Sequence, residues 1–216
     1  GEPAKGYAPQ IAALLKNRSY NVQLSLAHAC EEMGTTTEEY LLQIAVSLLT
    51  STHDYVRRVV VKAFAAMGES AKEYLPQIAT RLEDTDADVR LAAVQTLGTM
   101  GESTKGYLPQ IVALLKDTHV MVRMTVIETL KTMGESAKEC FPLIATLLKD
   151  MDNNVRGVAV QALGTMGESA EEYLPQIVTL LEDTDNNLQV AAVQALGAMG
   201  APAKGYAPQI AALLKD

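Results

Sequence analysis

Tryptophan is absent from this chain of 216 residues, and aromatic residues of all kinds make up only 5% of it. Apolar residues nevertheless account for 48%, so the apolar material is largely alanine, leucine and valine. Small and aliphatic side chains of this kind suit the close packing of helices against one another.

Basic residues are also few. The chain has 18 Lys and Arg against 26 Asp and Glu, for a net charge of −8. Nucleic-acid binding requires a basic surface that displaces counterions, so we expect no nucleic-acid partner. No apolar run approaches the 18 residues of a membrane span. We expect no signal peptide, no membrane partner and a cytoplasmic location.

A glycine-led phrase recurs along the whole chain. It begins at Gly1, Gly34, Gly68, Gly101, Gly134, Gly167 and Gly200, with a spacing of 33 residues that rises once to 34. Self-similarity at such a period is the signature of a solenoid. It predicts a single array over residues 1–216. The six repeats are 1–33, 34–67, 68–100, 101–133, 134–166 and 167–199, followed by a capping helix over 200–216.

The first half of each repeat has the pattern of a helix. In the repeat that starts at Gly68, apolar residues follow the helical period at Ala71, Tyr74, Leu75, Ile78 and Leu82. Ser70 with Glu73 has the spacing of a capping box, as has Thr36 with Glu39 one repeat earlier. Pro76 falls inside the predicted helix, so we expect a bend there.

The second half predicts another helix, reached through a polar turn whose oxygens can cap it. Val89, Ala93 and Leu97 lie on one side of this helix, and Gly101 follows its end, where glycine is favoured. Two helices in each of six repeats and one closing helix predict thirteen helices and an all-α fold.

Several of these positions resemble the HEAT-repeat family. The matching residues are Leu75-Pro76, Asp86, Val89-Arg90 and the run from Ala93 to Gly98. The resemblance is to regular cyanobacterial-type arrays and bilin-lyase-like HEAT units, and it extends over the whole chain. It implies a right-handed α-solenoid of helical hairpins in which the second helices line the concave side.

The resemblance also implies a ladder in which a turn aspartate and an arginine of the second helix bond within and between repeats. Asp86 with Arg90 keeps both members, whereas Arg57 and Arg123 stand opposite His53 and His119. At these two arginines we expect weaker electrostatic support.

Few residues form patterns typical of a metal site or a catalytic site. Asp84, Asp86 and Asp88 imitate the start of a calcium loop, but Val89 replaces the required glycine and Gln95 the bidentate glutamate. Cys30 occupies a slot filled by leucine in later repeats and is expected to be a buried thiol without a disulfide. We expect no enzyme activity, no metal and no cofactor.

Exposed positions of the second helices are uneven in character. The first, second and fourth repeats place aromatic, methionine and charged residues there, whereas the other repeats have bland ones. Tyr, Met and Arg are enriched at interface cores. The chain is therefore predicted to bind a protein or peptide on its concave face through Tyr20, Leu24, His28, Tyr55, Arg58, Lys62, Val120, Met121, Met124 and Glu128. Self-association into a homodimer and the absence of any role are the alternatives.

Two other functions stay open. A tetrapyrrole (bilin) lyase or chaperone would need Cys, His or several aromatics in the groove, where only Tyr20 and Tyr55 form a nearby pair. An idealised array without a natural partner is the other alternative, because GYAPQIAALLK occurs verbatim at residues 6–16 and 205–215. Such identity indicates an engineered or consensus-built array, or a recent duplication.

Overall fold

The computed structural model describes residues 19–32 and 39–212. Throughout these residues the ordered elements are α-helices and short 3-10 helices, with no strand. The chain forms two compact units, Gly1–Ile111 and Val112–Asp216, whose boundary passes through helix α8 (Leu108–Ala113). Each unit is described by itself.

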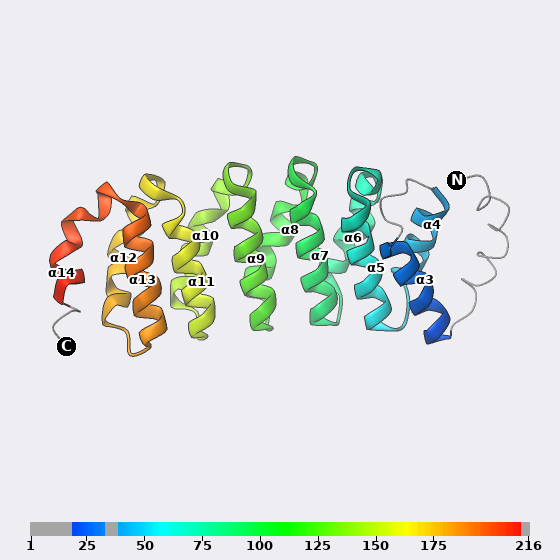
Figure 1. Cartoon of the computed structure of the whole chain (residues 1–216), viewed down its shortest axis with the longest axis horizontal. Coiled ribbons are helices and arrows are strands. Elements are labelled where there is room, and N and C mark those ends of the chain that lie inside the picture. Colours follow the sequence, from blue (N-terminus) through cyan, green and yellow to red (C-terminus); the bar gives the residue numbers. More distant parts are fainter. Residues whose placement is uncertain (1–18, 33–38, 213–216) are drawn as a thin grey trace. The chain divides into compact units, whose positions relative to one another are not determined.

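Unit 1 has two layers of helices. The second helices of its repeats, α3 (Tyr20–Glu32), α5 (Asp54–Met67) and α7 (Ala87–Thr99), stand side by side, with α5 packed against both neighbours. Helices α4 (Glu39–Leu48) and α6 (Leu75–Ala79) form the layer behind them (Figure 1). We call the surface formed by the second helices the second-helix face.

Unit 2 repeats the same arrangement. Its second helices are α9 (Val120–Met133), α11 (Asn153–Gly164) and α13 (Asn186–Met199), with α10 (Phe141–Thr146) and α12 (Leu174–Thr179) behind them and α14 (Ala207–Ala212) at the end (Figure 1). Helix α11 packs against both α9 and α13, and more extensively against α13. Both units are stacks of helical hairpins, so the predicted all-α solenoid is confirmed.

The first half of each repeat differs from the prediction. In the repeat that begins at Gly68 it consists of a 3-10 helix (Gly68–Tyr74), the short helix α6 and a second 3-10 turn (Thr80–Glu83). The capping box predicted at Ser70 and Glu73 is wrong, because the chain is already helical from Gly68. Pro76 lies in the first turn of α6, where its missing N–H would have had no helical partner. The counterpart at Thr36 lies outside the described residues.

The predicted core positions are confirmed. Ala71, Ile78, Val89 and Leu97 are all fully buried. Cys30 is also fully buried, its thiol 3.7 Å from the carbonyl oxygen of Leu41. Burial raises the pKa of this thiol from 9.0 to about 11, so it is neutral at ordinary pH and serves as a packing residue.

Glycine ends two of these second helices for a conformational reason. Gly68 follows α5 and Gly134 follows α9, each with φ of +53°. A Cβ atom is strained at such an angle, which explains why the repeat begins with glycine.

Ion pairs between successive repeats form a ladder, but with other aspartates than predicted. Arg57 Nε and Nη2 donate to the two carboxylate oxygens of Asp84 at 2.8 and 2.7 Å. Arg123 makes the same pair of bonds to Asp150 at 2.9 and 2.8 Å. The expectation of weaker support at these two arginines is wrong, because each pairs with the next repeat and not with the turn residue of its own.

The aspartate that the HEAT resemblance assigns to the ladder has a different role. Asp86 caps α7, its carboxylate accepting from the backbone N–H of Val89 at 3.0 Å. Asp152 caps α11 in the same way. The prediction that turn oxygens cap the second helices is thereby confirmed for these two helices.

Each arginine–aspartate pair forms one rung of the ladder. The rung also orders the turn that contains the aspartate. Asp84 accepts from the backbone N–H of Asp86 at 3.0 Å, and Arg57 donates to the carbonyl oxygen of Ser51 at 2.9 Å. The first rung has a neutral form, in which the Ser51 hydroxyl donates to the Gln23 amide oxygen at 2.6 Å. Arginine and aspartate are thus replaced together by glutamine and serine.

The Asp84 carboxylate is almost fully enclosed, with a side chain 3% exposed. Burial by itself acts to raise its pKa, but the hydrogen bonds from Arg57 and the Asp86 backbone and the charges of Arg57 and Arg81 outweigh burial. The net pKa of Asp84 lies below its usual value of 3.8, and that of Asp150 is lowered for corresponding reasons.

A second constraint fixes how closely two second helices approach. A Cβ atom added to Gly164, at the end of α11, would lie 2.7 Å from Cα and 2.8 Å from Cβ of Ala195 in α13. No real side chain tolerates such a contact without displacement of the backbone. Glycine at this position therefore permits the close packing of α11 on α13.

Replacing Asp84 by alanine should lower the free energy of unfolding by about 3 kcal/mol, because the enclosed Arg57 charge loses its partner. The double variant R57Q/D84S copies the neutral Gln23–Ser51 rung and should recover most of the loss. Urea denaturation measures both, with Glu69→Gln as a control that breaks only an exposed pair with Lys72. A double variant no better than D84A would contradict the interpretation of the rung.

Stability should fall in acid. The pKa values of Asp84 and Asp150 are lowered in the folded state, so their contribution is complete above the unfolded value near 3.8 and disappears as pH falls through the lower folded values. Thermal melting between pH 6 and pH 2 should show this loss. The R57Q/D84S variant, which lacks one of the two carboxylates, should show a smaller loss over the same range.

Gly164→Ala should destabilise the protein by about 2 kcal/mol, because the new methyl group overlaps Ala195. Gly157→Ala is the matched control in the same helix, since nothing lies within 4 Å of its added Cβ. This control should stabilise the helix by about 0.5 to 1 kcal/mol. Thermal melting that ranks the two variants in the opposite order would refute the close approach of α11 and α13.

Candidate functional site

The six sequence-predicted residues of unit 1 lie together on its second-helix face. Tyr20, Leu24 and His28 follow one another at intervals of four on α3, and Tyr55, Arg58 and Lys62 are three and four apart on α5. These intervals place each set along one side of its helix. We name the six residues the unit-1 patch.

Aromatic contacts join α3 to α5 at two levels. The Tyr20 ring meets the ring of His53, the N-cap residue of α5, at 5.2 Å between centroids and an interplanar angle of 73°. One turn or more further along, His28 and Tyr55 meet at 6.5 Å and 63°. Both are edge-to-face arrangements, the favoured geometry for ring pairs. They form two separate ring pairs across the contact of α3 with α5.

Arg58 links the aromatic residues of α5 to α7. Its guanidinium lies 4.6 Å from the centroid of the Tyr55 ring, within the range of a cation–π interaction. One of its nitrogens is 2.7 Å from the carboxylate of Asp88 on α7. The guanidinium thus lies between a ring and a carboxylate.

The patch presents aromatic and cationic side chains together. Tyr20 and Tyr55 are 40% and 39% exposed, although both are large aromatic side chains. Lys62 is exposed one turn beyond Arg58, while Leu24 and His28 are half-buried. His28 Nδ1 lies 3.5 Å from a carboxylate oxygen of Glu31. Rings, an apolar side chain and two cations thus share one surface.

The aspartates that imitate a calcium loop each have a structural partner. Asp84 pairs with Arg57, Asp86 caps α7 and Asp88 pairs with Arg58. Within residues 19–32 and 39–212, no three His, Cys, Asp or Glu side chains are grouped as metal ligands would be. Nor is any helix in this part of the chain long and apolar enough to cross a membrane.

The four sequence-predicted residues of unit 2 all lie on α9. Met121 is 49% exposed, while Val120, Met124 and Glu128 are half-buried. Glu128 is engaged in an ion pair with Lys131 at 2.6 Å. Within unit 2, the described interactions of these four residues do not form a network across helices like that of the unit-1 patch.

Sequence reasoning missed two residues that organise the patch. His53 was expected to be a turn residue, yet its ring supports Tyr20. Asp88 was considered only as part of a calcium-like run, yet it holds Arg58. The repeat spacing contains a signal for Asp88, because it occupies in the third repeat the position that Tyr55 occupies in the second, 33 residues earlier.

Stacked helical hairpins joined by ion pairs, with an exposed second-helix face, define this protein as an α-solenoid repeat scaffold. The family model for HEAT repeats matches residues 75–140 and 141–216, which together exceed half of the chain. The chain belongs to the HEAT-repeat family. A comparison with curated proteins gives no match.

Solved structures of similar fold include designed and natural repeat proteins. Computationally designed armadillo repeat proteins for modular peptide recognition are 18% identical, with 89% of this chain and 99% of theirs covered and a TM-score of 0.60. An engineered protein is 19% identical, with 89% and 97% covered and a TM-score of 0.59. The complex of CpcE and CpcF of phycocyanin lyase from a Nostoc species is 14% identical, with 73% and 99% covered and a TM-score of 0.57. At these identities the likeness is one of fold.

Proposed function

We propose that the chain is a non-catalytic scaffold that binds a peptide or protein segment on the second-helix face of unit 1. The observation that carries the proposal is the row Tyr55–Arg58–Asp88, in which a guanidinium is fixed between an exposed ring and a carboxylate. Tyr and Arg are the commonest hot-spot residues, and a side chain held in place before binding loses less entropy on association.

The chemistry of the patch suits an extended peptide. Two ring pairs link α3 to α5, so side chains at intervals along a peptide could meet first one pair and then the other. Arg58 and Lys62 supply donors for backbone carbonyls or carboxylates of the bound segment. The peptide-recognition purpose of the designed armadillo proteins of similar fold agrees with such a mode.

A tetrapyrrole lyase or chaperone function has less support. The fold of the phycocyanin lyase complex is similar, but a lyase would need reactive groups on the binding face. Cys30 is fully buried with a raised pKa, and the pKa of the half-buried Cys140 is also raised, by burial and by Glu139. Neither thiol has the lowered pKa that favours nucleophilic attack.

The test selects peptides from a random display library against the intact chain and measures their affinity for variants. Tyr55→Ala and Arg58→Ala should each weaken binding by about 2 kcal/mol, roughly thirtyfold in the dissociation constant. Their melting temperatures should change little, because both side chains project from the packed core.

Asn153→Ala and Asn186→Ala are the matched controls, since both residues are exposed on second helices of the bland repeats. Selected peptides that bind the Tyr55 and Arg58 variants as tightly as the parent would refute the unit-1 patch. If no peptide is enriched and the protein sediments as a dimer, self-association replaces peptide binding. If it is a monomer that binds nothing, an array without a partner is the better description.

A further inference from the structure

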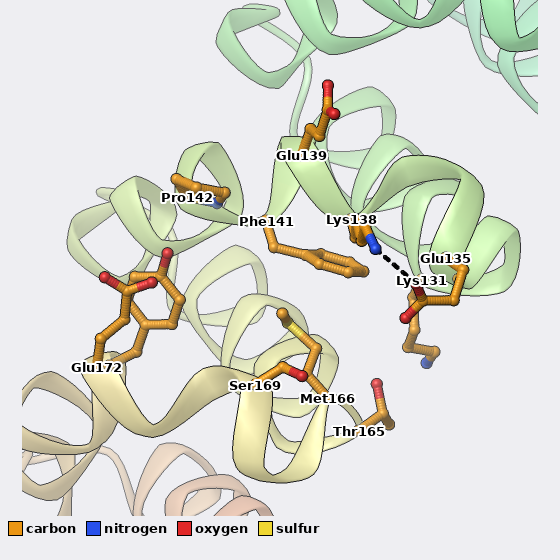
Figure 2. A pocket seen from close by; sticks show the side chains of 12 residues that line it. Lys131, Glu135, Lys138, Glu139, Phe141, Pro142, Thr165, Met166, Ser169 and Glu172 are labelled. Carbon is orange, nitrogen blue, oxygen red and sulfur yellow. Dashed lines mark hydrogen bonds and ion pairs between the residues drawn. The ribbon is translucent and has the colours of Figure 1, made fainter.

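Unit 2 contains a groove that the proposed function does not use. It has a volume of about 830 Å³ and lies where the ends of α9 and α11 meet the 3-10 helices Gly134–Cys140 and Gly167–Tyr173. Figure 2 shows the Phe141 ring at its centre with Met166 facing it. The volume falls within the range typical of small-molecule sites.

Near the end of α9, Lys131 occupies the slot that holds Gly164 in the next repeat, 33 residues later. At Gly164 a Cβ would overlap Ala195, so α11 has no side chain in this slot where it packs on α13. Helix α9 packs less extensively on α11 than α13 does, and Lys131 lines the groove.

Two further departures from the repeat pattern occur at the groove. Phe141 replaces the leucine found at Leu75 and Leu174, and Cys140 replaces the tyrosine found at Tyr74 and Tyr173. Phe141 is 8% exposed and, with Met166 and Tyr173, forms apolar and aromatic walls. Lys131 near the end of the fourth repeat and Phe141 in the fifth thus both depart from the pattern and both line the groove.

The charges around the groove are predominantly negative. Lys131 pairs with Glu128, and Lys138 pairs with Glu135 at 2.9 Å, so both lysines are neutralised locally. Glu139 and Glu172 also line the groove. Figure 2 shows Glu172 across the Phe141 ring from the Lys138–Glu135 pair, and the Glu139 carboxylate directed away from that ring.

Burial, together with a nearby glutamate, raises the pKa of each of two titratable residues beside the groove. Burial, followed by the hydrogen bond and charge of Glu172, raises the pKa of Tyr173. Burial and the charge of Glu139 raise the pKa of Cys140. A site that combines aromatic walls with negative potential favours a cation that has an apolar body.

We propose that this groove binds a small hydrophobic organic cation, with its apolar body against Phe141 and Met166 and its ammonium group near Glu172. The apolar body displaces water from the floor of the groove, and the ammonium group meets a carboxylate that has no cationic partner among the described ion pairs. This site belongs to unit 2 and is independent of the unit-1 patch.

The experiment compares three probes of nearly equal size: 2-phenylethylammonium, 2-phenylethanol and phenylacetate. Binding to the full chain is followed by the backbone amide resonances of residues 134–139 and 165–173. The ammonium probe should bind best, the alcohol more weakly and the carboxylate not measurably. Equal binding of all three probes, or shifts elsewhere in the chain, would overturn the proposal.

Variants separate the charge from the shape of the groove. Glu172→Gln should weaken binding of the ammonium probe about fivefold, the usual upper size of an exposed ion pair. Glu139→Gln removes the same charge from a carboxylate that points away, and should have a smaller effect. An equal effect of the two variants would show that only long-range charge matters, which contradicts an ammonium group placed at Glu172.

Discussion

The bond from an arginine of one second helix to the first turn aspartate of the next repeat is the constraint on which the stacking depends. Asp84 receives two bonds from Arg57 and accepts the N–H of Asp86, so a single carboxylate ties a repeat to its predecessor and shapes its own turn. Because the group is enclosed, its charge must be matched. The neutral rung of Gln23 and Ser51 meets this requirement by removing both charges together.

Packing adds a second constraint at the opposite end of the same helices. Gly164 allows α11 and α13 to touch, and the equivalent slot of α9 holds Lys131, which lines a groove. In a solenoid each repeat contacts only its neighbours, so such a change has a local effect and leaves the rest of the stack intact. Variation can accumulate in this way without loss of the fold.

Much of this could be predicted from the repeat period. The buried stripes through Ile78 and Val89 and the cap at Asp86 follow from local pattern and were predicted correctly. The first helix was predicted less well, since the period does not distinguish α from 3-10 geometry around Pro76. Of the candidate site, Tyr55 and Arg58 could be proposed from the sequence because they depart from the repeat at positions expected to be exposed. His53 was missed because its role depends on a ring in another repeat.

The sequence by itself determined that the chain is a helical array, which residues are buried and where each second helix begins and ends. These properties depend on neighbours within a few residues or on the regular spacing of 33. Only the tertiary structure decided that Arg57 pairs with Asp84 and Arg58 with Asp88, and that Lys131 and Met166 line one groove. Such contacts join residues about thirty positions apart, and they depend on helix separation and side-chain direction, which a one-dimensional pattern does not contain.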